Sequence, residues 1–170
     1  MFPAAIFAWG MVDFSFEMVI SASCFAQLKR HRMATLLPQS YDPSLGYTIP
    51  ESIQNDKASL EGFERIMERS ETVHKQLCVV NPHVAPYALT NAHRRRVLFK
   101  CNLRELYAFS RLRQDCHAQW EIRDIANKIV DEIHSVAPLA TMLLAGKDTF
   151  EQLKKMALDP EGFVNESQSR

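Results

Sequence analysis

The sequence predicts an α+β fold in which a small, mostly antiparallel sheet is combined with a dominant set of helices. Two short segments alternate apolar and polar residues, which is typical of half-buried strands. Longer segments repeat apolar residues at helical spacing, which is typical of amphipathic helices. With 170 residues, 46% of them hydrophobic and 24% charged, the chain is long enough for one core and too short for two full-sized domains. We therefore expect a single domain over residues 1–170.

The first segment, Met1–Trp9, is apolar and resembles a targeting signal only in that respect. It has no preceding basic region, and Asp13 and Glu17 follow it where a signal peptide has small residues before its cleavage site. It is also much shorter than the roughly 20 apolar residues that span a bilayer. We expect this segment to pack against the rest of the fold or against another subunit.

The first regular element is a strand over residues 12–18. Its apolar positions all fall on one face: Val12, Phe14, Phe16 and Met18. Ser21 and Ser23 then offer hydroxyl groups that can cap a short helix through Leu28. That helix should end in the basic run Lys29–Arg32.

Residues 36–50 contain three prolines and a glycine, so we expect a long irregular connection there. Loops of this length in compact domains are commonly functional or disordered. A helix is expected over Ser59–Leu77, where apolar residues recur at helical spacing among charged ones.

A second strand is predicted over Arg95–Cys101, and the longest helical region, Leu103–Val136, follows it. A break in this region is expected near Asp115 and Cys116, and Pro138 limits the region. Asp148 and Glu151 resemble a capping box for a last helix, Thr149–Met156. The final residues, NESQSR, resemble a frayed tail.

The charge and cysteine content exclude several classes of function. Twenty basic residues balance twenty acidic ones, so the chain has no overall field to attract nucleic acid or an anionic membrane. The four cysteines form no CxxC pair and have no zinc-site spacing, so we expect no metal and interpret them as reduced thiols of a cytoplasmic protein.

One cluster of polar residues surrounds the basic run. It consists of Gln27, Arg30, His31 and Arg32, with Ser40 following after seven residues. The planar guanidinium group matches phosphate and carboxylate oxygens, so two arginines beside a flexible loop form a candidate anion site. The alternative is a solvated basic helix end, which the helix dipole favours in any case.

A second cluster occupies the segment from Asn102 to Glu121. On a helix, Arg104 and Arg111 would share one face, while Arg113 and His117 would lie about half a turn away. Arginines on two sides suggest a helix that contacts ligands or subunits on both faces. Alternatively, these arginines pair with nearby acidic residues. The candidates for that pairing are Glu105, Asp115 and Glu121.

The two clusters together resemble the flavin-dependent thymidylate synthase family. The family signature RHR, seven residues and serine is matched by Arg30-His31-Arg32 and Ser40, and Gln27 precedes it as glutamine often does there. The segments Asn102-x-Arg104, Arg111-Leu112-Arg113 and His117–Arg123 resemble the second family block in order and distance. The resemblance covers roughly residues 12–140, and it implies a shortened family domain without the usual N-terminal helical segment.

This resemblance implies a homotetramer that converts dUMP to dTMP with FAD as cofactor and with NADPH and methylenetetrahydrofolate as co-substrates. It implies that Arg30, His31, Arg32, Asn102, Arg104 and His117 bind the flavin. It implies that Gln27, Arg32, Ser40 and Arg113 bind dUMP, and that Arg113 and Ser40 belong to the catalytic site. Arg113 would hold the uracil ring and favour its ionised form, because a fixed positive charge stabilises negative charge that develops on the pyrimidine.

The chain also departs from the family at three positions. Pro38 stands where an acidic residue is usual, Asp42 stands where an arginine is usual, and Pro86 falls near another nucleotide-contacting arginine. One of the residues 94–96, all arginine, is a candidate substitute. These departures keep open a divergent homologue that binds flavin or nucleotide without thymidylate synthase activity. A third hypothesis, a nucleic-acid-binding module built on the two basic runs, is disfavoured by the zero net charge.

Overall fold

The computed structural model describes residues 9–158. Residues 1–8 and 159–170 lie outside this range. The expectations for the apolar Met1–Trp9 segment, except Trp9 itself, and for the tail NESQSR therefore fall outside the described residues.

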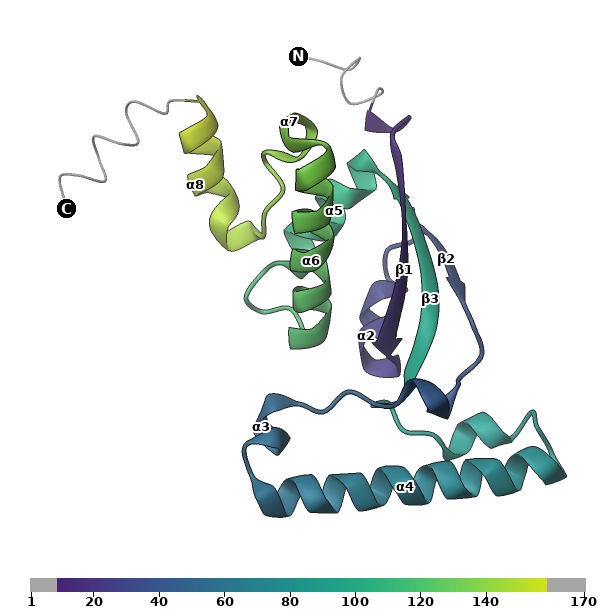
Figure 1. The fold of residues 1–170 in the computed structure, drawn as a ribbon. Helices are drawn as coiled ribbons and strands as arrows, with labels where there is room; N and C mark the ends of the chain where they lie inside the picture. The colour runs from purple at the N-terminus through teal and green to yellow at the C-terminus, as the bar shows by residue number, and fades with distance from the viewer. Residues whose placement is uncertain (1–8, 159–170) are drawn as a thin grey trace. The chain divides into compact units, whose positions relative to one another are not determined.

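A three-stranded sheet forms the β part of the fold. Its strands are β1 (Asp13–Ser21), β2 (Thr35–Pro38) and β3 (Arg94–Asn102), in the order β1-β3-β2. β2 runs antiparallel to β3, with Thr35 opposite Lys100 and Pro38 opposite Val97. The central strand is thus the one that leads directly into the second polar cluster (Figure 1).

Both predicted strands are confirmed, and their alternation is confirmed with them. In β3, Val97 and Phe99 are buried, while Leu98 and Lys100 between them are exposed. In β1, the buried positions are Met18, Ile20 and Ser21, so the strand continues beyond the predicted end at residue 18. Val12, the predicted start, precedes the strand and is 45% exposed. One face of the sheet therefore contributes to the core, as the period of two predicts.

The expectation of an irregular connection over residues 36–50 is wrong at its start, because residues 36–38 belong to β2. β2 is a short strand at the edge of the sheet, and its residues are exposed or half-buried, Leu37 being 58% exposed. Its sequence therefore does not alternate between buried apolar and exposed polar residues. Pro38 ends it, which an edge strand tolerates because a proline there removes no hydrogen bond that the ladder needs. Beyond β2, the 3₁₀ helix η1 (Pro43–Leu45) and a bridge between Tyr47 and His93 order the rest of the connection.

The chain divides into two compact units. Unit 2 contains Ser15–Arg30 and Thr35–Lys100. Within it, α2 (Ala22–Leu28) is capped by Ser21, whose hydroxyl accepts a hydrogen bond from the Cys24 amide at 3.0 Å. The short α3 (Glu51–Gln54) precedes the long α4 (Lys57–Val80), and α4 packs along η2 (Ala85–Ala88).

Unit 1 contains the described residues 9–14, 31–34 and 101–158. Its helices are α5 (Leu103–Arg113), α6 (Trp120–Val136), α7 (Pro138–Thr141) and α8 (Lys147–Leu158). α6 packs against α5 and α7, and α8 contacts α5. The predicted break in the long helical region is confirmed, because α5 ends at Arg113 and α6 begins at Trp120.

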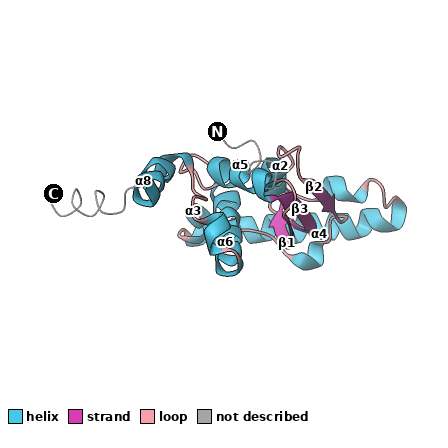
Figure 2. Ribbon diagram, turned by 90° about the horizontal axis from the view of Figure 1, so that it is seen from above, coloured by secondary structure: helices cyan, strands magenta, loops and turns pink. Residues whose placement is uncertain are grey.

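The predicted α+β class is confirmed, since helices dominate and the sheet is small and antiparallel (Figure 2). Within residues 9–158, no helix combines the length and the apolar character that a membrane crossing requires.

Candidate functional site

The centre of the candidate site is the buried imidazole of His31, which joins the two polar clusters predicted from the sequence. Its Nδ1 lies 2.9 Å from Oε1 of Glu105, and its Nε2 accepts a hydrogen bond from Nε of Arg113 at 2.9 Å. His31 is 5% exposed, and each of its ring nitrogens has a hydrogen-bond partner within the protein. The histidine of the RHR run therefore binds directly to the arginine at the end of α5.

These contacts define the protonation state of His31. Because Arg113 donates to Nε2, that nitrogen must carry a lone pair, and the ring proton resides on Nδ1 and is donated to the Glu105 carboxylate. Burial lowers the pKa of His31 below its ordinary value of 6.5, and the nearby positive charge of Arg113 lowers it further, against the opposing effect of Glu105. A neutral imidazole is thus the form that fits the site.

Helix α5 brings the partners of His31 together by its periodicity. Glu105, Phe109 and Arg113 are four residues apart, so they follow one another along one face of the helix. The ring of Phe109 meets the His31 ring edge-on with 5.1 Å between centroids. The helix begins at Asn102, whose side chain accepts a hydrogen bond from the Glu105 amide at 2.9 Å and so positions the first turn.

Three other predicted site residues of unit 1 are exposed or half-buried. Arg32 and Arg104 are exposed, and neither forms an ion pair with any residue in the 9–158 range. Asn102 is half-buried at the N-cap of α5. Arg113 follows Arg104 by nine positions on the helix, about 14 Å along the axis at 1.5 Å per residue. The arginines therefore occupy opposite ends of α5.

The expectation that His117 shares a helix face with Arg113 is wrong. α5 ends at Arg113, and His117 lies in the turn that leads to α6. Its Nδ1 is 2.9 Å from Oδ1 of Asp115, and its side chain is 89% exposed. The helical pattern continued to Val136 in the sequence, but the Asp115 carboxylate accepts hydrogen bonds from both the amide and the ring of His117, which stabilises a turn instead.

The remaining predicted residues belong to unit 2. Gln27 is half-buried on α2, Arg30 is exposed just after that helix, and Ser40 is exposed just after β2. Arg30 has no ion pair among the residues that the structure describes.

Arg95 lies beside the segment that carries Ser40. Its guanidinium carbon is 4.9 Å from the centroid of the Phe25 ring and 4.4 Å from that of Tyr41, so the two rings enclose it. Its Nε donates to the carbonyl oxygen of Gln39 at 3.0 Å, and its Nη2 donates to the same oxygen. Of the three arginines proposed as substitutes, Arg96 instead pairs with Glu17, and Arg94 donates to Thr48.

Asp42 has a structural reason to be an aspartate. Its carboxylate accepts a hydrogen bond from the Ser44 amide at 2.9 Å and caps η1. The hydrogen bonds from Ser44 lower the pKa of Asp42 below its ordinary value of 3.8. The residue at this departure from the family pattern is therefore negatively charged and fixed at the start of a turn.

Two features of this arrangement were not assigned to the site from the sequence. The sequence predicts Glu105 only as a partner for arginine, but its spacing from Arg113 by two helical steps of four also indicates that the two share a helix face. The enclosure of Arg95 by two rings joins residues that are distant in the sequence, so no local pattern indicates it.

The described structure is that of an α+β protein in which a buried histidine accepts a hydrogen bond from the arginine at the end of α5. Residues 8–139 match the family model described as thymidylate synthase complementing protein. This match covers well over half of the chain, so the chain belongs to that family.

Individual relatives agree with this family. A UPF0159 protein of Thermoplasma acidophilum is 30% identical over 139 residues, covering 81% of this chain and 28% of the relative. A flavin-dependent thymidylate synthase of Thermococcus onnurineus is 33% identical over 123 residues, covering 66% of this chain and 50% of the relative. A flavin-dependent thymidylate synthase of Clostridium tetani is 30% identical over 141 residues, covering 70% of this chain and 57% of the relative. The chain thus spans about half the length, or less, of these relatives.

Proposed function

We propose that the chain is an FAD-dependent thymidylate synthase that converts dUMP to dTMP with methylenetetrahydrofolate and NADPH. The observation that carries this proposal is the hydrogen-bonded series Glu105, His31 and Arg113. It couples the RHR run to the arginine that the family resemblance assigns to the uracil ring. A single proton on Nδ1 orients the imidazole, and the imidazole orients the guanidinium.

In this proposal Arg113 is the catalytic residue and His31 is a positioning residue. A planar guanidinium can donate to a carbonyl oxygen and to the deprotonated ring nitrogen of ionised uracil, and its permanent charge stabilises negative charge that develops on the ring. Because His31 binds Nε, it fixes the plane of the Arg113 guanidinium before substrate arrives.

We propose that the arginines assigned to the cofactor pair with its dianionic diphosphate. Arg30, Arg32 and Arg104 are exposed and have no ion pair with a described residue, so their charge is available to a ligand. The N-terminus of α5, capped by Asn102, adds the positive end of a helix dipole. FAD would supply the hydride chemistry there, and His117 would contact it from the exposed turn.

The dUMP phosphate is assigned to the segment after β2. We propose that Ser40 donates to the phosphate, that Gln27 contacts the nucleotide, and that Arg95 replaces the arginine that the family usually carries near Pro86. The rings of Phe25 and Tyr41 hold the Arg95 guanidinium in one orientation, and its remaining N–H groups can donate to a phosphate.

The long helix α4 supports the proposed homotetramer. Of its 24 residues only Met67 is buried, while Ile66, Val73 and Val80 are 59%, 38% and 82% exposed. These three are seven residues apart, so they form one apolar stripe along the helix. A second copy of the chain would bury such a stripe.

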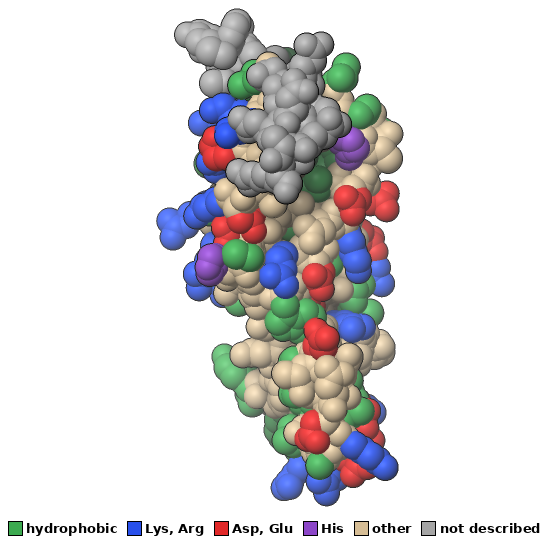
Figure 3. Space-filling model, turned by 90° about the vertical axis from the view of Figure 1, so that its left-hand side faces the viewer, with side chains coloured by type: hydrophobic (Ala, Val, Ile, Leu, Met, Phe, Trp, Pro, Cys, Tyr) green, Lys and Arg blue, Asp and Glu red, His purple; other side chains and the backbone are tan. Residues whose placement is uncertain are grey.

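The cysteines and the surface charges agree with the remaining parts of the proposal. Burial raises the pKa of Cys101 to about 12, so its thiol is no nucleophile, and the proposed reaction uses none. All four cysteines are free thiols, which fits the proposed cytoplasmic location. Acidic and basic side chains are interspersed on the face drawn in Figure 3, so that face presents no continuous basic patch for nucleic acid.

A second candidate function is a divergent homologue that binds flavin or nucleotide without making dTMP. Asp42 favours it, because its fixed negative charge lies two residues after Ser40, where an approaching phosphate would be repelled.

The absorbance spectrum of the purified chain tests the flavin assignment. We expect the bands of oxidised flavin after incubation with FAD and removal of the excess, and we expect their loss in Arg30→Ala and Arg32→Ala variants that keep the wild-type circular dichroism. Flavin retention by both variants would contradict the assignment. Arg69→Ala, an exposed arginine on α4, is the matched control and should leave the bands unchanged.

A further inference from the structure

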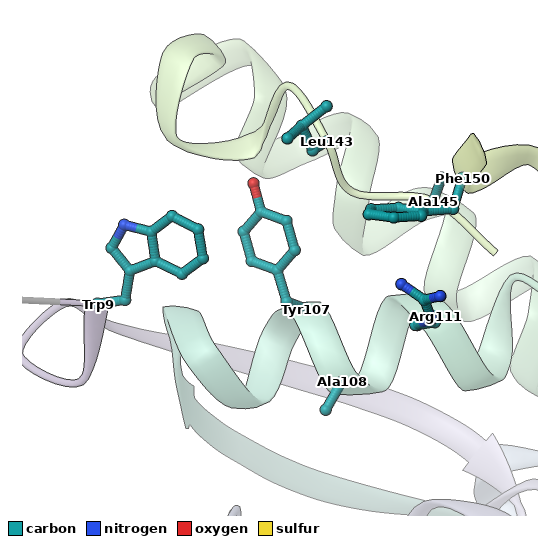
Figure 4. Close-up of a pocket in the computed structure, with 7 residues that line it drawn as sticks. All are labelled: Trp9, Tyr107, Ala108, Arg111, Leu143, Ala145 and Phe150. Carbon is teal, nitrogen blue, oxygen red and sulfur yellow. The ribbon is translucent and has the colours of Figure 1, made fainter. Parts of the chain in front are cut away.

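Unit 1 contains an apolar pocket that none of the assigned residues lines. It has a volume of about 280 Å³ and opens between α5, α8 and the segment that joins α7 to α8 (Figure 4). Tyr107 and Arg111 reach into it from α5, while Leu143 and Phe150 cover it from the other side. Tyr107 and Arg111 are one helical turn apart and so share a face of α5.

Aromatic rings form much of the wall of this pocket. The rings of Trp9 and Tyr107 are stacked, with 4.9 Å between centroids and 11° between planes. The Tyr107 hydroxyl donates to the carbonyl oxygen of Ala140 at 2.8 Å, so its only polar atom is satisfied and its ring is fixed. A flat apolar surface is therefore available without further rearrangement.

Among the described residues that line the pocket, Arg111 carries the one charge. The guanidinium carbon of Arg111 lies 4.3 Å from the centroid of the Phe150 ring, and Arg111 forms no ion pair with any residue among those described. A cation over an aromatic ring remains a strong hydrogen-bond donor along its edge. The edge of this group is therefore available to an anion.

We propose that this pocket binds a small aromatic carboxylate, with the ring against the aromatic wall and the carboxylate on Arg111. A cavity of roughly 150 Å³ is large enough for benzene, so the volume of about 280 Å³ accommodates one ring with a carboxylate substituent. The charge of Arg111 selects an anion over a neutral or cationic ring. The site is separate from the proposed function, because none of these residues is assigned to flavin or dUMP.

Tryptophan fluorescence gives a direct readout, because the chain has two tryptophans and Trp9 lines the pocket. In a Trp120→Phe background, benzoate should change the Trp9 emission in a saturable way, with a dissociation constant in the millimolar range expected for so small a ligand. Benzyl alcohol and benzamidine, of similar size but neutral and cationic, should each bind about ten-fold more weakly.

Variants identify the residue responsible. Arg111→Gln should weaken benzoate binding about ten-fold, Arg111→Lys should weaken it less, and the matched control Arg69→Gln on α4 should have no effect. Equal binding of benzoate and benzyl alcohol, or unchanged affinity in Arg111→Gln, would refute the proposal. So would an unsaturable response of Trp9.

Discussion

Replacing His31 by alanine should destabilise the protein, because two charge-assisted hydrogen bonds are lost in a buried position. The imidazole bonds Glu105, whose side chain is 12% exposed, and Arg113, both at 2.9 Å. Hydrogen bonds to charged groups contribute about 1.5–3 kcal/mol each, and the two partners can recover part of this by hydration, so we expect a net loss of about 3 kcal/mol. For a chain of this size that loss lowers Tm by about 6–12 °C.

Thermal unfolding at neutral pH, followed by circular dichroism, measures this loss. His117→Ala is the matched control, because His117 also lies 2.9 Å from a carboxylate, that of Asp115, but its side chain is 89% exposed. The control should leave Tm unchanged. His31→Gln can keep one of the two hydrogen bonds, so its Tm should lie between those of His31→Ala and His117→Ala. Equal Tm values for the alanine variants at positions 31 and 117 would refute the role of His31.

Three further predictions concern pH, the phosphate site and assembly. Burial lowers the pKa of His31 and His93 below 6.5, so below pH 6.5 the folded chain binds fewer protons than the unfolded one. The free energy of unfolding should therefore be highest above pH 6.5 and should decrease as pH falls through the folded pKa values. The decrease should be smaller in His31→Gln, and the same pH profile in this variant and the wild type would contradict this. Asp42→Asn should keep the cap on η1 and tighten dUMP binding about five-fold, as measured by calorimetry, while the binding of uridine should not change. An unchanged dUMP affinity would mean that the phosphate does not bind near residue 42. Ile66→Asp should dissociate the proposed tetramer in light scattering, while Lys75→Asp on the opposite face of the same helix should not, and a tetramer in both would exclude the α4 stripe as the interface.

The sequence was sufficient for the elements whose signal is local. The alternation around Val97 and Phe99 and the helical period of Ser59–Leu77 report burial on one face, and both elements are present. Strand β2 was not predictable in this way, because its four residues are exposed or half-buried and their hydrogen bonds go to β3, more than fifty residues away. A pairing partner so distant leaves no trace in the local pattern.

The candidate site was predictable in its residue types but not in its contacts. The family resemblance placed His31 and Arg113 in one site, yet they are 82 residues apart in the sequence and nothing local indicates that they bind each other. The spacing of Glu105, Phe109 and Arg113 does indicate a shared helix face. His117 was misplaced for a physical reason, because a turn stabilised by Asp115 ends the helical pattern that the apolar residues suggested.

Formation of dTMP from dUMP by the purified chain tests the central claim most directly. The reaction would contain FAD, NADPH and methylenetetrahydrofolate, and the product would be separated from dUMP by chromatography. We predict that the wild type forms dTMP and that Arg113→Lys does not, although it keeps its fold and flavin, because an ammonium group cannot reproduce the planar pairing of a guanidinium. A flavin-loaded wild type that forms no dTMP would contradict the proposed activity and establish the chain as a divergent homologue.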